Sequence, residues 1–327
     1  SEEPERGIYT EKQHQIITKQ ICDFANNQIT AEANGAEELL LTEPIKNLCA
    51  RFNHQIPVTV VQGAKGSGKT FLYRQLIEKK NWNSFFSEIT HKKISKENGY
   101  FIPVLAPQNI SQIQTVLGQC IDCFNEALPF ADVSQSIYSD NSYRLDLKAN
   151  KEIDWMKKSN ILAVQSAAWL AIILNGENSL FLPYDNIFKK YRINDSQKIN
   201  EFLGQDIDTG FRIKKEEKTV IFLIDGLEEI LKAVSSNKNQ QKAIEVLCQG
   251  VLNTISARYE NIGLIIFIRS DMAQNAITVN YEQFRQSFAY AELKWSSAEA
   301  LKLAVWLVSH ANSDFYRESI PIENASQ

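Results

Sequence analysis

Residues 57–70, PVTVVQGAKGSGKT, constrain the fold of this chain more than any other stretch. A short β-branched run leads into Gly63-x-x-x-x-Gly68-Lys69-Thr70, and an amphipathic segment, FLYRQLIEKK, follows at once. Strand, glycine loop and helix in this order are typical of the Walker A motif, in which inward-pointing backbone N–H groups and a helix N-terminus bind phosphate. The alternative is an ordinary glycine turn, which does not require this order of residues. We therefore predict a phosphate-binding loop.

The side chains of this loop suit the phosphates and the metal of a nucleoside triphosphate. Lys69 supplies a mobile cation for the β- and γ-phosphates, and Thr70 supplies a hydroxyl for Mg²⁺. The predicted nucleotide-binding residues are Gly63, Ala64, Lys65, Gly66, Ser67, Gly68, Lys69, Thr70 and Phe71.

The second chemical element is KTVIFLIDGLEEI. The unbroken apolar run 219–224 predicts a central parallel strand, buried on both faces, that ends in Asp225. A carboxylate at this edge of the sheet binds Mg²⁺ beside the phosphate-binding loop. Gly226 stands where the catalytic glutamate of such sites usually lies, and acids return at Glu228 and Glu229. Either glutamate is a candidate to orient and deprotonate the attacking water, and the alternative for both is a solvated, acidic helix start.

A third apolar strand, GLIIFI over 263–268, ends in Arg269. Ligand-binding groups gather at the carboxyl ends of the strands in a parallel sheet, so we expect Arg269 at the same edge as Asp225. There its guanidinium would sense the γ-phosphate or stabilise charge during transfer. A salt bridge to Asp271 is the alternative role.

Composition and cysteine usage narrow the class of protein. The net charge of −4 over 327 residues argues against a generally basic, nucleic-acid-binding surface. The longest apolar stretch, residues 161–174, is shorter than the roughly 20 residues that cross a bilayer and predicts a buried helix. The N-terminus is acidic and shows no signal peptide. Cys120 and Cys123 form a CxxC with no partner at zinc spacing, which favours reduced thiols in a cytoplasmic protein.

The segments VVQGAKGSGKT, LIDGLEEI, FIRSD and ELKWSSAEALKL together resemble the STAND class of P-loop ATPases, which includes the NACHT and KAP-like groups. The stretch ending in DGLEE is close to the hhhhDGLDE form of NACHT proteins, and Arg269 looks like the sensor arginine of the class. WSSAEALKL is similar to the segment that leads into the helical lid. The resemblance implies ATP and Mg²⁺ as cofactors, sheet order 5-1-4-3-2, and slow hydrolysis. Many relatives are bacterial signalling or antiphage defence switches, which implies a protein partner or self-association.

These observations predict a doubly wound α/β fold of the P-loop NTPase type with a mainly five-stranded parallel sheet. YFIPVLAP and AYAELKW supply the remaining strands. The expected parts are an N-terminal helical segment (residues 1–56), the P-loop core in two pieces (57–127 and 218–295), a mainly helical insertion between these pieces (128–217) and the start of the helical lid (296–327). An insertion of this length is a departure from the family.

Two other functions fit part of the pattern. A mechanical AAA-type or nucleic-acid-remodelling ATPase would need a trans-acting arginine and a basic channel, for which the available basic cluster is Lys157, Lys158, Lys189, Lys190 and Arg192. A small-molecule or nucleoside kinase would need a basic lid cluster, which the sequence does not contain. The sequence predicts no membrane contact.

Overall fold

The computed structural model describes residues 9–29, 42–92, 99–107, 119–120, 123, 150–176, 219–289 and 291–319. The chain divides into two compact units, one formed by Glu43–Lys294 and the other by Ser1–Thr42 with Trp295–Gln327. The larger unit contains the sheet and every residue predicted for the functional site.

The larger unit is built on a five-stranded sheet in which every strand pair is parallel. The strands are β1 (Val58–Gly63), β2 (Gly99–Leu105), β3 (Thr219–Ile224), β4 (Ile262–Arg269) and β5 (Ala291–Leu293). Their order across the sheet is β2-β3-β4-β1-β5. The predicted α/β class and five-stranded parallel sheet are confirmed, and the order read from β5 is the 5-1-4-3-2 that the family resemblance implies.

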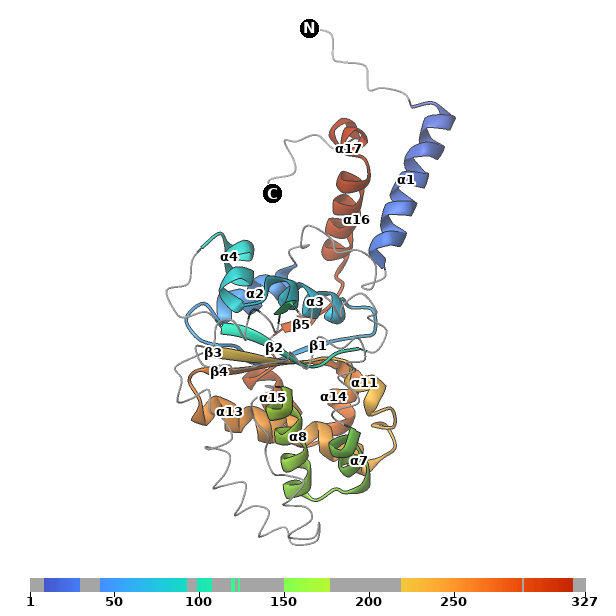
Figure 1. The fold of residues 1–327 in the computed structure, drawn as a ribbon. Coiled ribbons are helices and arrows are strands. Elements are labelled where there is room, and N and C mark those ends of the chain that lie inside the picture. Colours follow the sequence, from blue (N-terminus) through green and yellow to red (C-terminus); the bar gives the residue numbers. More distant parts are fainter. Residues whose placement is uncertain are drawn as a thin grey trace. The chain divides into compact units, whose positions relative to one another are not determined.

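Helices cover both faces of this sheet (Figure 1). One face carries α2 (Glu43–Arg51), α3 (Lys69–Lys79) and α4 (Trp82–Thr90). The other face carries α7 (Asn150–Lys158), α8 (Leu162–Gly176), α12 (Lys238–Glu245), the π-helical segment η2 (Val246–Val251), α13 (Leu252–Arg258), α14 (Ser270–Ala276) and α15 (Tyr281–Ser287). A single turn, α11 (Leu227–Ile230), follows β3 directly.

The core explains the apolar runs of the sequence. All six residues of β3 are buried, because β3 lies between β2 and β4 and is covered on both faces. The apolar segment predicted as a buried helix is α8, whose Trp169 is fully buried and donates its indole N–H to the Ala243 carbonyl at 2.7 Å. Among the described residues, no helix is long and apolar enough to cross a membrane.

Part of the sequence prediction lies outside the described residues. The predicted insertion 128–217 is described only over residues 150–176, which form α7 and α8 as expected for a mainly helical segment. The stretch 111–128, SQIQTVLGQCIDCFNEAL, has a pattern that predicts a helix, and it is described only at Gln119, Cys120 and Cys123, which are helical. Three members of the basic cluster, Lys189, Lys190 and Arg192, also fall outside.

The cysteines are free thiols. Cys49, Cys120 and Cys248 are buried, Cys123 is half-buried and Cys22 is exposed. The Cys120 thiol donates to the Phe101 carbonyl at 3.3 Å, and burial raises the pKa of Cys49 and Cys248 to about 12. Three of the five cysteines are therefore packed in the interior as protonated thiols.

The smaller unit consists of α1 (Glu11–Ile29), α16 (Ser297–Ala311) and α17 (Ser313–Ser319). Phe24 of α1 packs against Trp306 of α16, with ring centroids 5.9 Å apart. The Ser296 hydroxyl accepts a hydrogen bond from the Glu299 N–H at 3.1 Å. Ser296 is therefore the N-cap of α16.

Gly226 holds the turn between β3 and α11 in a conformation that other residues rarely adopt. Its φ is 79°, and an added Cβ would lie 3.0 Å from the Cα of Pro107. We expect Gly226→Ala to lower the free energy of unfolding by about 2–4 kcal/mol, the sum of left-handed backbone strain and overpacking against backbone. Gly66→Ala is the matched control, because Gly66 has the same φ of 79° but no atom within 4 Å of the added Cβ. It should lose only about 1–2 kcal/mol in urea unfolding, and equal losses would contradict the packing argument.

Candidate functional site

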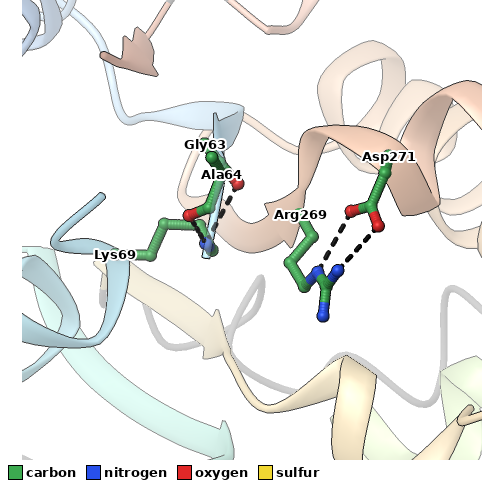
Figure 2. Close-up of polar contacts among 5 residues, drawn as sticks. All are labelled: Gly63, Ala64, Lys69, Arg269 and Asp271. Carbon is green, nitrogen blue, oxygen red and sulfur yellow. Dashed lines mark hydrogen bonds and ion pairs between the residues drawn. The ribbon is translucent and has the colours of Figure 1, made fainter. Parts of the chain in front are cut away.

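The predicted phosphate-binding loop joins β1 to α3 at the carboxyl edge of the sheet. Gly66 and Gly68 both have positive φ, at 79° and 94°, and Gly68 is the N-cap of α3. The Lys69 side chain curls back over the loop, and its Nζ donates to the carbonyls of Gly63 at 3.0 Å and Ala64 at 2.9 Å (Figure 2). Backbone N–H groups at the start of α3 and the lysine ammonium thus share one small region of positive potential.

Lys69 is a buried cation. Only 5% of its surface is exposed. Burial lowers its pKa, while the negative charges of Glu228 and Asp225 act in the opposite direction. The two carboxylates are therefore close enough to Lys69 to stabilise its charged form.

Asp225 and Thr70 form an oxygen pair across the end of the sheet. The Thr70 hydroxyl donates to Asp225 Oδ2 at 2.9 Å, and the Gly226 N–H donates to Oδ1 at 2.8 Å. Asp225 itself directly follows β3, and its backbone N–H donates to the Leu105 carbonyl at the end of β2. The fold thus brings a hydroxyl from α3 and a carboxylate from β3 together, although 155 positions separate them in the sequence.

The Asp225 carboxyl group is almost fully buried, at 1% exposed. Burial raises its pKa to about 7, and the negative charge of Glu228 acts in the same direction. The hydrogen bonds from Gly226 and Thr70 and the charge of Lys69 oppose this shift. A bound cation would stabilise the ionised form of such a carboxyl group.

Glu228 is the acid of α11 that acts on the rest of the site. Its charge stabilises the protonated forms of Lys69, Asp225 and Arg269. Its Oε2 atom is buried and has no hydrogen-bond partner among the described residues. A buried carboxylate oxygen without a partner is costly, so this atom is available to accept a bond from a ligand or a water molecule.

Arg269 is the last residue of β4 and lies at the same edge of the sheet. Its Cα is paired with that of Gly63 in the parallel register, so the arginine stands beside the first glycine of the loop. Its Nε donates to Asp271 Oδ1 at 3.0 Å and its Nη2 to Oδ2 at 2.7 Å, as Figure 2 shows. This ion pair is the alternative role that the sequence offers for Arg269.

The side chains predicted to bind phosphate, metal and water therefore come from three stretches of the sequence and meet at one sheet edge. They are Lys69, Thr70, Asp225, Glu228 and Arg269. Of the other predicted residues, Ala64, Lys65 and Gly66 are exposed, Gly63 and Ser67 are buried, and Gly68, Phe71 and Glu229 are half-buried.

Sequence reasoning missed Tyr73, a polar residue directly beside this group. Tyr73 is fully buried on α3, and its hydroxyl has no hydrogen-bond partner among the described residues. Burial raises its pKa well above the ordinary value, and the charge of Asp225 adds to the shift. Its position three residues after Thr70 places both on one helix face, and this spacing was the available signal.

The described residues contain no group of three or more His, Cys, Asp or Glu side chains that could hold a metal ion. A Mg²⁺ ion held by one hydroxyl, one carboxylate, phosphate oxygens and water does not need such a cluster.

Comparisons with models of protein families, with curated proteins and with solved structures find no match. The arrangement of these side chains is thus the main guide to function.

The raised pKa of Asp225 predicts a pH-dependent stability. The folded protein holds the Asp225 proton up to about pH 7, whereas the unfolded chain loses it near pH 3.8. The folded state thus binds more protons between these values, and its free energy of unfolding falls as the pH rises. Asp225→Asn removes this contribution. From pH 5 to pH 8 the parent should lose roughly 2–3 kcal/mol relative to the variant in urea unfolding, and a pH-independent difference would contradict the prediction.

Proposed function

We propose that this chain binds Mg-ATP at the carboxyl edge of its sheet and hydrolyses it slowly, as a switch ATPase similar to the STAND class. The observation that carries the proposal is the meeting of Lys69, Thr70, Asp225, Glu228 and Arg269 at one edge. A glycine turn alone would account for the loop, but not for a buried cation and two acids beside it. The parallel sheet and its strand order are compatible with a P-loop NTPase fold.

The triphosphate would bind in the loop between β1 and α3. The backbone N–H groups of a glycine-rich loop and the N-terminus of α3 suit the phosphate oxygens. Lys69 Nζ, now bonded to two loop carbonyls, has a third hydrogen and a flexible stem, so it can reach the β- and γ-phosphates without leaving the loop. Its lowered pKa reflects burial, and phosphate charge would stabilise the ammonium further.

The residues present fit a Mg²⁺ ion. Thr70 Oγ1 and Asp225 Oδ2 lie 2.9 Å apart, and both are the hard oxygen ligands that Mg²⁺ prefers. Thr70 would bind the ion directly, and Asp225 would bind it directly or through water. When bound, the ion would neutralise part of the phosphate charge. In this role Asp225 holds a negative charge in a buried position. Its raised pKa reflects the free energy that ionisation costs there.

Glu228 is the residue that we assign to the attacking water. Its Oε2, which has no hydrogen-bond partner among the described residues, can accept a hydrogen bond from water, and its charge raises the pKa of Lys69, Asp225 and Arg269 against the opposing effects. Because Gly226 occupies the place after Asp225, the acid comes one helical turn later, on α11. A displaced base is consistent with slow turnover, which suits a switch better than a motor.

A switch requires the protein to change its conformation or assembly when ATP binds. The molecular mass in solution measures a change of assembly directly. A shift to a defined oligomer with a non-hydrolysable ATP analogue, together with turnover well below about 1 s⁻¹, is the expected result. Turnover that rises on adding DNA and falls with salt would instead favour a nucleic-acid-remodelling ATPase. Appearance of a phosphorylated acceptor would favour a kinase.

A further inference from the structure

The contact between Arg269 and Asp271 uses one edge of the guanidinium and leaves the other open. Nε and Nη2 both bond to Asp271, at 3.0 and 2.7 Å. Nη1 has no hydrogen-bond partner among the described residues, and in Figure 2 it points away from Asp271. A bidentate ion pair of this kind fixes the plane of the guanidinium as well as its position.

The Arg269–Asp271 pair is coupled electrostatically to the charged groups of the site. The charge of Glu228 raises the pKa of Arg269, and Arg269 and Asp271 both shift the pKa of Lys69. The pair therefore lies within electrostatic reach of the cation that would hold the β- and γ-phosphates. Since Arg269 is paired with Gly63 across the strands, its side chain starts from the edge of the phosphate-binding loop.

Asp271 keeps its charge and orientation through contacts of its own. Its pKa is lowered first by the hydrogen bond from Arg269 and also by the backbone N–H groups of Met272 and Asp271. It lies in the first turn of α14, which packs on the sheet. Its side chain is 57% exposed, so the ion pair adds little stability to the fold. An exposed acid with a weak structural role but a fixed geometry is well suited to orient another residue.

We propose that Asp271 is a positioning residue, which holds the Nε–Nη2 edge of Arg269 so that the Nη1 edge meets the γ-phosphate. The inference rests on the proposed ATPase function and deepens it. Arg269 would stabilise the charge that develops on the γ-phosphate, and Asp271 would act only through Arg269. Preorganised donors of this type contribute most in the transition state, so Asp271 should affect kcat more than KM.

The test compares steady-state ATP hydrolysis by the parent and four variants. We expect Arg269→Ala to lower kcat about 100-fold and Asp271→Asn about 10-fold, with KM changed less than about threefold. Asp271→Glu keeps the carboxylate and should recover most of the activity. Because Asp271 acts through Arg269, the double variant Arg269→Ala/Asp271→Asn should be no slower than Arg269→Ala alone.

A matched control separates the proposed positioning role from the general effect of losing a surface ion pair. Arg285 and Glu282 form an exposed ion pair on α15 with a separation of 3.5 Å, and Glu282→Gln should leave kcat unchanged. An Asp271→Asn effect of the same size in the Arg269→Ala background would overturn the inference, because Asp271 would then act independently. Faster turnover by Asp271→Asn would also overturn it, because Asp271 would then compete with the phosphate. If Arg269→Ala is impaired but Asp271→Asn is not, only the inference fails, whereas a parent that binds no ATP overturns the proposed function as well.

Discussion

Replacing Lys69 with alanine is expected to lower the affinity for Mg-ATP by about 100- to 10,000-fold. The variant loses charge-assisted hydrogen bonds to two phosphates, each worth roughly 1.5–3 kcal/mol. These bonds are strong here because Lys69 is 5% exposed and is therefore little screened by solvent. The change also removes the bonds that tie Nζ to the carbonyls of Gly63 and Ala64, so the loop loses part of its preorganised shape. Binding of a fluorescent ATP analogue measures the effect.

Lys65 provides the matched control for this prediction. It carries the same charge in the same loop, but its side chain is exposed. Lys65→Ala should weaken binding by no more than about threefold, because an exposed charge contributes little and is screened by salt. Equal losses for the two variants would mean that only the general positive charge of the loop matters, and the assignment of Lys69 would be wrong.

Glu228→Gln is expected to lower kcat by about 100- to 10,000-fold while ATP still binds. The amide keeps the size of the side chain and one oxygen acceptor, but it no longer takes a proton from water. Binding should be unchanged or slightly tighter, because the variant removes one negative charge near the phosphates. Single-turnover hydrolysis of radiolabelled ATP separates the chemical step from binding.

Glu229→Gln tests the choice between the two glutamates. Both lie on α11, and both are half-buried. Glu228 combines two observations: its buried Oε2 has no hydrogen-bond partner among the described residues, and its charge is coupled to Lys69, Asp225 and Arg269. Glu229→Gln should therefore change kcat by less than about threefold. The reverse result would move the catalytic role to Glu229.

The sheet was predictable from the sequence because its strands carry strong local signals. The run 220–224 is apolar without interruption, as expected for a strand buried on both faces, and it belongs to β3. The positions of Asp225 and Arg269 at one edge then follow from parallel geometry, without any knowledge of side-chain contacts. The strand order came from the family resemblance and not from the residues, since local patterns say little about which strands pair.

Side-chain partners were less predictable, since they depend on packing between distant segments. The sequence left Glu228 and Glu229 equivalent, whereas in the structure the Oε2 atom of Glu228 is buried with no hydrogen-bond partner among the described residues. From the sequence, a salt bridge to Asp271 was the alternative to phosphate binding by Arg269. The observed bidentate geometry permits Arg269 to contact Asp271 and a phosphate at the same time. The helix α4 was also missed, because its aromatic residues follow the Walker A helix after a break of only Lys80 and Asn81.

The central claim is that this chain holds Mg-ATP at the edge where the loop, Asp225 and Arg269 meet. Isothermal titration of the parent with a non-hydrolysable ATP analogue, with and without Mg²⁺, tests it most directly. We predict one nucleotide bound per chain, with an affinity that falls at least tenfold when Mg²⁺ is removed and a Mg²⁺ effect that disappears in Asp225→Asn. No binding at millimolar nucleotide, or binding that is the same with and without Mg²⁺, would contradict the account.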